Sequence, residues 1–165
     1  PTLVEGDNLI VVSMGKINRG GIVIVKIDDQ INTITSGVVD DELVVKRVIA
    51  GPGDTFYFNN QGILYLNEKI VDEFYLKDEY GRFKMGNSYN ALTDNFSIED
   101  VAVISGVNIC NAGEECRIPD DYYFVMGDNR RYSIDSRDIG LIHKSQIMGV
   151  AKYKKRSFLD WEKLK

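Results

Sequence analysis

The sequence predicts an all-β fold built from antiparallel sheets, and three observations support this prediction. Nine Tyr and seven Phe accompany many Val and Ile residues, a composition that favours strands. The apolar runs are short and are separated by residues typical of turns, mainly Gly, Asn and Asp. Apart from the C-terminal end, no segment shows a sustained apolar repeat of the helical period. A length of 165 residues is enough for one domain with a sizeable insertion.

Strands are expected wherever β-branched and aromatic residues form a short run between turn-forming residues. In chain order, these runs cover residues 8–13, 21–27, 43–49, 122–126, 139–142 and 146–153. Residues 55–58 and 63–66 predict a hairpin, because the connection between them is Asn-Asn-Gln-Gly. At the C-terminal end we expect a short helix that begins after Ser157, since Phe158, Trp161 and Leu164 would share one helical face.

The chain divides into segments of different character. Residues 1–66 and 118–153 hold most of the predicted strands and are expected to form a β core. Residues 67–117 are more polar and weakly patterned, which predicts a cap or insertion. Residues 154–165 are expected to form a short amphipathic tail, in which basic residues beside an aromatic anchor suit a membrane surface or simply pack on the core.

Composition excludes several classes of function. Twenty Lys and Arg against 25 Asp and Glu give a net charge of −5, which argues against nucleic acid as the main partner. The longest apolar runs fall far short of the roughly 18–20 residues needed to cross a bilayer. His143 is the only histidine, so sites that need two imidazoles from this chain are excluded. We expect neither a metal nor a cofactor.

Cys110 and Cys116 are the two cysteines, and they lie in a polar stretch with Gly113 between them. Their separation allows a disulfide, which would indicate an oxidising, extracytoplasmic setting. Free thiols are the alternative. A zinc site would need further ligands from another chain.

Lys46 is unusual because it lies in a predicted strand of apolar residues. Alternation along that strand places Lys46 on one face with Val44 and Val48. Burial would lower the pKa of the amine, and a lysine that is neutral near pH 7 can act as a general base. The alternative is an edge-strand lysine whose charged end reaches water.

A second unusual segment is the charged loop between residues 127 and 140. It combines acidic and basic side chains with two hydroxyl groups, so it could form a rigid ion-pair network or a solvated surface loop. Its candidate residues are Asp128, Arg130, Ser133, Asp135, Ser136 and Arg137.

Taken in order, three segments resemble the type I signal peptidases, membrane-bound Ser-Lys endopeptidases that remove signal peptides from exported proteins. Pro1-Thr-Leu at the start matches the second half of the family motif Ser-Met-x-Pro-Thr-Leu. Lys46-Arg-Val-Ile, followed by Pro52-Gly-Asp, matches the general-base motif. Gly127-Asp-Asn-Arg and the hydroxyl and charged residues that follow it match the last motif. The fold implied is the signal-peptidase-type Ser-Lys peptidase fold with a small cap.

The resemblance implies a role for each candidate residue. Lys46 would be the general base, and Ser133 would hydrogen-bond and orient its amine. Asp128, Asp135 and Arg137 would form an ion-pair network, supported by Arg130 and Ser136.

Substrate would bind as an added strand along the edge of residues 43–45. Leu3 and Val45 would line pockets for small side chains, and Leu43 and Val44 would complete the edge. The partners implied are the signal peptides of preproteins, either general secretory proteins or one pilin-like client.

The family motif also implies a nucleophile outside this sequence. Its serine lies three positions before the proline that corresponds to Pro1, so we expect both that serine and an N-terminal membrane anchor upstream. The domain would then work on the extracytoplasmic face of the cell membrane. The alternative function is a non-catalytic, signal-peptidase-like assembly factor for surface pili, which would bind extended segments without cutting them.

Overall fold

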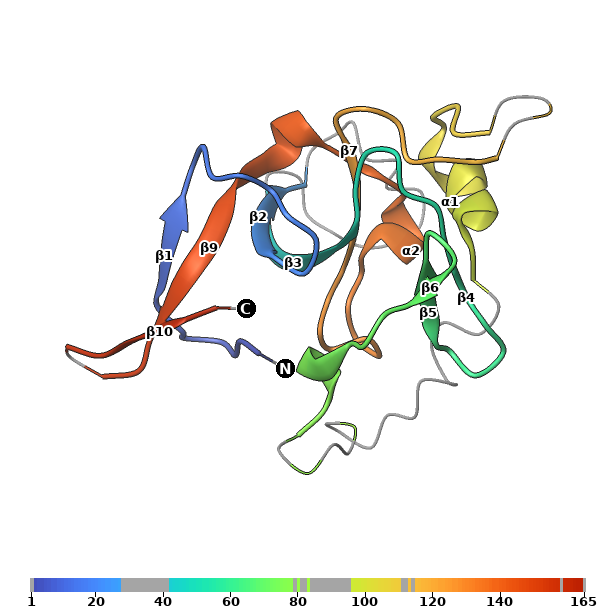
Figure 1. Cartoon of the computed structure of the whole chain (residues 1–165). Coiled ribbons are helices and arrows are strands. Elements are labelled where there is room, and N and C mark those ends of the chain that lie inside the picture. Colours follow the sequence, from blue (N-terminus) through green and yellow to red (C-terminus); the bar gives the residue numbers. More distant parts are fainter. Residues whose placement is uncertain are drawn as a thin grey trace.

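A computed structural model describes residues 2–27, 42–78, 80, 83, 96–110, 113, 115–157 and 159–164. Pro1 and Phe158, for which the sequence predicted roles, lie outside these residues. The main body is a mostly antiparallel β structure, as predicted (Figure 1). None of the helices in this part of the chain is long and apolar enough to span a bilayer.

The larger sheet has the strand order β1-β9-β2-β3-β7-β8, and all of its pairs are antiparallel. Its strands coincide with the predicted β-branched and aromatic runs, with boundaries shifted by a few residues. They are β1 (Leu9–Val12), β2 (Ile22–Lys26), β3 (Leu43–Ala50), β7 (Tyr122–Met126), β8 (Ile142–His143) and β9 (Ile147–Lys155).

The smaller sheet contains the predicted hairpin. β4 (Phe56–Phe58) pairs with β5 (Leu64–Leu66), and β5 pairs in turn with β6 (Lys69–Ile70). The 3-10 turn η1 (Phe74–Leu76) follows this sheet. In Figure 1 the small sheet lies on the same side of the molecule as helix α1, opposite β1 and β10.

The predicted C-terminal helix is wrong. Trp161–Lys163 instead form strand β10, which pairs antiparallel with the end of β9. The physical reason lies in β9, which continues through Lys155 after its pairing with β2 has ended at Ala151. That leaves backbone groups along the same edge, and β10 satisfies them. The amphipathic spacing was compatible with a helix, but sheet pairing determined the structure.

Two helices were not predicted. α1 (Ile98–Ser105) begins after Ser97, which forms a reciprocal capping box with Asp100, and buries Ile98 and Val101. α2 (Ser136–Ile139) is a single turn inside the charged loop. The strand expected at 139–142 is therefore wrong in its first part, because Ile139 ends a helix and only Ile142 enters β8.

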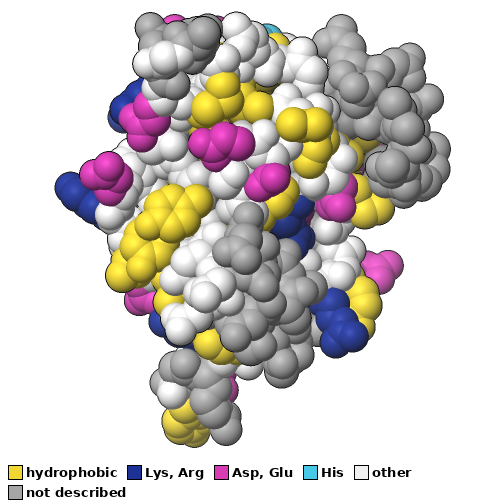
Figure 2. Space-filling view, turned by 90° about the vertical axis from the view of Figure 1, so that its right-hand side faces the viewer, with side chains coloured by type: hydrophobic (Ala, Val, Ile, Leu, Met, Phe, Trp, Pro, Cys, Tyr) yellow, Lys and Arg dark blue, Asp and Glu magenta, His cyan; other side chains and the backbone are white. Residues whose placement is uncertain are grey.

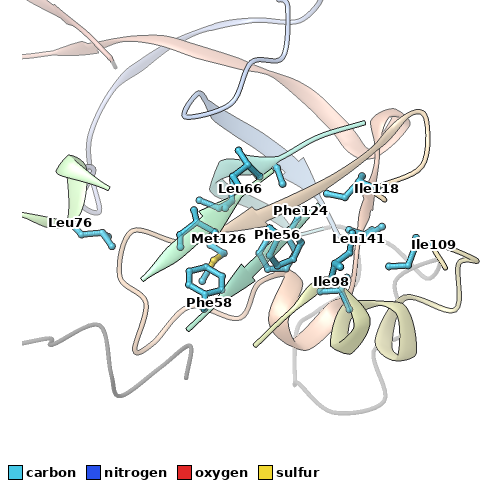
Figure 3. Packing of buried hydrophobic residues seen from close by; sticks show 14 of the residues in the cluster. Phe56, Phe58, Leu66, Leu76, Ile98, Ile109, Ile118, Phe124, Met126 and Leu141 are labelled. Carbon is cyan, nitrogen blue, oxygen red and sulfur yellow. The ribbon is translucent and has the colours of Figure 1, made fainter. Parts of the chain in front are cut away.

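Within the described ranges, the core consists of two hydrophobic clusters. One lies between the small sheet, α1 and the end of β7, where the Phe56 and Phe124 rings stack with centroids 4.3 Å apart (Figure 3). The other is formed by β2, β3, β8 and β9 and includes Val48. β3 contributes residues to both clusters, so its position is fixed from two sides. We propose that residues 1–66 and 118–153 form the β core, residues 67–117 the cap and residues 154–165 the C-terminal tail.

Acidic and apolar side chains are interspersed over the face on the α1 side of the molecule (Figure 2). This pattern agrees with the acidic composition of the chain. At the other end, Ile10, Val11 and Val12 of β1 and Met14 expose apolar side chains, with Met14 97% exposed.

Candidate active site

Lys46 lies near the middle of β3, on the face that it shares with Val44 and Val48. Val48 is buried in the second hydrophobic cluster, and Val44 packs against that cluster. Burial lowers the pKa of the Lys46 amine, although the negative charges of Asp135 and Glu42 act in the opposite direction. The apolar face therefore favours the neutral form of the amine, compared with a lysine exposed to solvent.

Two cavities meet at this lysine, since the walls of both include Lys46, Tyr132 and Ser133. The first has a volume of about 260 Å³ and is also lined by Leu3 and Val45. The substrate-contact residues predicted there are thus placed beside the predicted base.

The second cavity has a volume of about 160 Å³, and its wall includes Val44 and Glu42. Leu43 is 59% exposed and lines neither of these two cavities. Of the four predicted substrate-contact residues, three lie on cavity walls and Leu43 lies on the strand edge.

Ser133 lies beside Lys46, but the predicted hydrogen bond between them is not formed in this structure. The Ser133 hydroxyl is buried and has no hydrogen-bond partner among the described residues, and the same is true of Asn129 Oδ1 in the first cavity. Gly127 packs against Ser133 so closely that a Cβ atom there would lie 2.2 Å from Ser133 Oγ. A glycine at 127 therefore allows the serine its position.

Arg47 forms the central ion pair of the site. This side chain is 1% exposed, and its Nε and Nη2 donate to the two carboxylate oxygens of Asp128 at 2.7 and 2.8 Å. Thr2 donates to the same carboxylate, and Arg47 also donates to the carbonyl of Gly20. Burial alone would raise the pKa of Asp128, but the hydrogen bond and charge of Arg47 outweigh it and lower the pKa.

A second pair fixes the far end of the charged loop. Arg137 donates from Nε and Nη2 to the two carboxylate oxygens of Asp135, at 2.8 and 2.9 Å. Asp135 is fully buried, accepts from the backbone N–H of Gly127 and caps α2. Ser136 is also buried, and its hydroxyl accepts from the backbone N–H of Val125 in β7. Through these contacts the loop is attached to the sheet.

The third pair joins Arg130 to Glu73, which lies just before η1. Both side chains are almost completely buried, at 6% and 0% exposure. Arg130 also donates from Nε to the carbonyl of Gly127 at 3.2 Å, and its own carbonyl accepts from Arg137. Burial disfavours the guanidinium charge of Arg130, but Glu73 outweighs it and raises the pKa.

The geometry thus differs in one respect from the predicted network. The sequence grouped Asp128 with Asp135 and Arg137, whereas Asp128 pairs with Arg47 on β3. The reason is that Arg47 points away from the Lys46 face, toward the loop that carries Asp128.

Sequence reasoning gave no role to Arg47, Thr2, Glu73, Tyr75 or Tyr132. A second charged residue in an otherwise apolar strand was a signal for Arg47. Glu73 and Tyr75 carry no comparable signal, because their partners are distant in sequence.

The single histidine of the chain does not take part in the site. His143 packs its ring edge-on against Tyr122, and its Nδ1 lies 2.7 Å from the Ser145 hydroxyl. Within the described ranges, no three His, Cys, Asp or Glu residues are grouped closely enough to hold a metal ion.

Comparison with known proteins identifies close relatives. Residues 1–154 match the family model described as "Signal peptidase, peptidase S26". Signal peptidase I S of Bacillus subtilis strain 168 is 37% identical over 147 residues, covering 88% of this chain and 63% of that protein. Signal peptidase I of Streptococcus pneumoniae serotype 4 is 33% identical over 165 residues, covering 93% of this chain and 76% of that protein. The chain therefore spans less than two thirds of the first of these relatives.

A solved structure of a signal peptidase I is similar to this chain in fold. The crystal structure of a signal peptidase I from Enterococcus faecalis V583 superposes with a TM-score of 0.57 at 26% sequence identity. The match covers 84% of this chain and 98% of that one. The similarity therefore extends over most of the fold described above.

Proposed function

Because the chain belongs to the signal peptidase family, peptidase S26, we propose that it forms the catalytic domain of a type I signal peptidase, an endopeptidase that cleaves signal peptides from exported preproteins. The observation that carries the proposal is Lys46, a lysine on an apolar strand face with a lowered pKa at the junction of two cavities. Such an amine is suited to general-base catalysis without a histidine.

In this mechanism, the neutral amine of Lys46 removes the proton from a serine hydroxyl as its oxygen attacks the carbonyl carbon of the scissile peptide bond. The ammonium then gives a proton to the departing amine, and water hydrolyses the resulting ester with Lys46 again as base. We assign the nucleophile to the serine that stands three positions before the proline of the family's first motif. Ser133 would orient the Lys46 amine when substrate is bound.

We propose that substrate adds as a strand to the edge of β3. β2 pairs with β3 from Leu43 to Arg47, whereas β7 pairs only with Arg47, Val48 and Ala50. On the β7 side, residues 43–46 therefore have no strand partner within the described part of the chain. An extended peptide on this edge would lie beside Leu3 and Val45 on the wall of the first cavity.

The test is cleavage of a preprotein by the full-length gene product. Lys46→Ala is expected to abolish cleavage while leaving the fold intact, because no other group would take the proton. Lys16→Ala, at an exposed lysine in the loop after β1, is the matched control and should cleave as the wild type does. Substantial cleavage by Lys46→Ala would overturn the assignment of the base. A wild-type protein that binds preprotein without cutting it would instead indicate the assembly-factor function.

For the location of the enzyme, we propose that the domain rests on the extracytoplasmic face of the membrane through the end that carries β1 and β10. Ile10, Val11 and Val12 are about 40% exposed, and Met14 and Leu159 are 97% and 87% exposed. Exposed apolar side chains on the elements of one end are suited to the headgroup boundary of a bilayer.

Vesicle binding tests this location. Replacing Met14 and Leu159 with Asp should weaken co-sedimentation with phospholipid vesicles. Val103→Asp is a fair control, because Val103 is 86% exposed but lies on α1 at the opposite end of the molecule (Figure 1). If Val103→Asp weakens vesicle binding as much as the replacement of Met14 and Leu159 does, the proposed orientation is contradicted.

We also propose that Cys110 and Cys116, whose sulfur atoms are adjacent in the structure, form a disulfide in the mature protein. An extracytoplasmic setting favours this oxidised state. Thiol titration of the unreduced, denatured protein should detect no free cysteine, and two free thiols would refute the bridge.

A further inference from the structure

Glu73 and Tyr75 are two buried polar residues to which the sequence motifs assign no role. Glu73 is 0% exposed and Tyr75 is 8% exposed, and both come from the short segment around η1. The Tyr75 hydroxyl donates to Glu73 Oε1 at 2.7 Å. Burial and the nearby Glu73 charge raise the pKa of Tyr75, so its phenol stays neutral and keeps its proton as a donor.

Each of these two residues contacts a different element of the candidate active site. The guanidinium carbon of Arg47, next to Lys46 on β3, lies 4.0 Å from the centroid of the Tyr75 ring. Glu73 forms the buried ion pair with Arg130 in the charged loop. Together they connect β3 to that loop through a continuous series of side-chain contacts.

The contacts of Arg130 extend the series to Ser133. Arg130 Nε donates to the carbonyl of Gly127, and a Cβ atom added at Gly127 would lie 2.2 Å from Ser133 Oγ. The position of Gly127 therefore sets how deeply Ser133 can sit beside Lys46. A shift of the Arg130 side chain would be transmitted to Gly127 and from there to Ser133.

We infer that Glu73 and Tyr75 are positioning residues of the enzyme, which hold the Gly127–Ser133 segment at a fixed distance from β3 and so align Ser133 with Lys46. The inference rests on the proposed peptidase function and deepens it. Neither side chain lies on the wall of either cavity at Lys46, so they act through Arg47 and Arg130 rather than on substrate.

Energetics support a positioning role for this pair. Burying a carboxylate and a guanidinium together costs desolvation energy that apolar side chains of similar size would not. A buried ion pair does, however, restrict geometry, because Arg130 donates from both Nη1 and Nη2 to the two Glu73 carboxylate oxygens. At this place in the fold, fixed geometry is what the two catalytic elements require.

Charged groups around Lys46 affect the pKa of its amine, so a displacement of the loop would change that pKa. Asp135 acts on the Lys46 amine from the N-cap of α2, Arg137 and Asp138 act on it from α2 itself, and Glu42 precedes β3. Burial outweighs their combined effect and keeps the pKa of Lys46 low. A loosened loop would admit water to the amine and raise that pKa toward its ordinary value.

The experiment compares Glu73→Gln and Tyr75→Phe with wild type in the full-length enzyme. We expect Glu73→Gln to lower kcat by about 10- to 100-fold with KM changed by less than about twofold, because alignment is lost while substrate contacts stay. Tyr75→Phe keeps the ring on Arg47 and loses only the hydroxyl, so we expect a loss of about 3- to 10-fold. Glu73→Asp should recover part of the activity lost by Glu73→Gln.

The matched control is Asp72→Asn, which changes the neighbouring carboxylate. Asp72 is 70% exposed and pairs with Lys77 at the surface, so its replacement should leave kcat unchanged. If Glu73→Gln fails to fold, Tyr75→Phe still tests the inference.

A second readout does not depend on cleavage. The 13C NMR titration of the Lys46 side chain, assigned with Lys46→Ala, should move to higher pH in Glu73→Gln and in Tyr75→Phe. Variants that melt at lower temperature but keep the wild-type kcat and Lys46 titration would overturn the inference and show a purely structural pair. A wild-type enzyme that does not cleave would instead overturn the proposed function, with the titration still testing the positioning role.

Discussion

The chemistry proposed for Lys46 comes from its surroundings on β3. Val44 and Val48 flank it along one strand face, and the buried cluster behind them removes water from the amine. Such a site lowers the stability of the fold, because the charged form of the lysine is disfavoured there. The same property makes the neutral amine available near physiological pH.

Replacing this lysine with an apolar residue should stabilise the domain. Lys46→Met is expected to raise the free energy of unfolding at pH 7, because the lowered folded-state pKa means that the charged amine destabilises the native state. This penalty is present below the folded-state pKa and disappears as pH rises past about 10.4, the unfolded-state value.

Denaturant unfolding at pH 7 and at pH 11 measures this effect. Lys16→Met at the exposed lysine controls for the general effect of the substitution. Equal stability changes for the two variants at pH 7 would show that Lys46 is solvated.

Gly127 packs so closely against Ser133 that a side chain has no room there. In Gly127→Ala, the added Cβ would lie 2.2 Å from Ser133 Oγ and 2.5 Å from Ser133 Cβ. We expect a loss of stability of about 1–3 kcal/mol, typical of overpacking, together with a loss of cleavage.

The double variant Gly127→Ala/Ser133→Gly separates the two effects, because it removes the clashing atoms and the hydroxyl together. Thermal unfolding should return toward wild type while cleavage stays low. A double variant that recovers both would show that the Ser133 hydroxyl has no role.

Among the secondary-structure elements, most strands were predictable, whereas β10 and the two helices were not. β2, β3 and the β4–β5 hairpin follow from local patterns of β-branched and aromatic residues between turns. α1 is short and buries few side chains, so its apolar repeat is weak, and the Ser97–Asp100 capping box is the main local signal for it. α2 is held by Asp135, whose partner Arg137 becomes evident only in the folded loop.

In the candidate site, too, features with a local sequence pattern could be predicted and long-range contacts could not. The lysine and the charged loop could be found from motifs, whereas the pairs Arg47–Asp128 and Glu73–Arg130 join residues far apart in sequence. No local pattern encodes such partners, because they depend on the strand order β2-β3-β7.

The free edge of β3 makes a specific prediction about substrates. Along the edge of a strand, backbone N–H groups of an added strand point alternately toward and away from its partner. N-methylation of a substrate peptide at successive positions before the scissile bond should therefore impair cleavage in alternation. We expect about a 10-fold loss of kcat/KM at paired positions, equal to one lost hydrogen bond, and little change at the others. Uniform effects at every position would argue against strand addition.

At the scale of the whole molecule, Arg47 connects segments from distant parts of the chain. Its guanidinium contacts Thr2 near the start, Gly20 before β2, Tyr75 after the small sheet and Asp128 after β7. The ion pair with Asp128 is therefore expected to support the assembly of the two sheets as well as the site.

Removing this carboxylate should destabilise the entire fold. Asp128→Asn is expected to cost about 3–5 kcal/mol at pH 7, because it leaves a buried guanidinium without its charged partner. The pKa of Asp128 is lowered, so its contribution is present above the unfolded value of about 3.9 and is lost as pH falls through the folded-state value.

Urea unfolding between pH 7 and pH 2 should accordingly show the gap between wild type and Asp128→Asn closing in acid. Asp121→Asn, at a carboxylate that is 57% exposed and pairs with Lys144, should differ from wild type by no more than about 1 kcal/mol. A constant gap at all pH values would mean that the charge of Asp128 contributes nothing to stability.

Lys46 is proposed to act as a neutral general base, and the dependence of the cleavage rate on pH is the sharpest test of this role. With the full-length enzyme and a preprotein in single-turnover conditions, the rate should rise with pH as Lys46 loses its proton. The midpoint of that rise should lie well below the value of about 10.4 for a solvated lysine, because burial lowers the pKa. A rise centred near 10.4, or a rate independent of pH, would contradict the account.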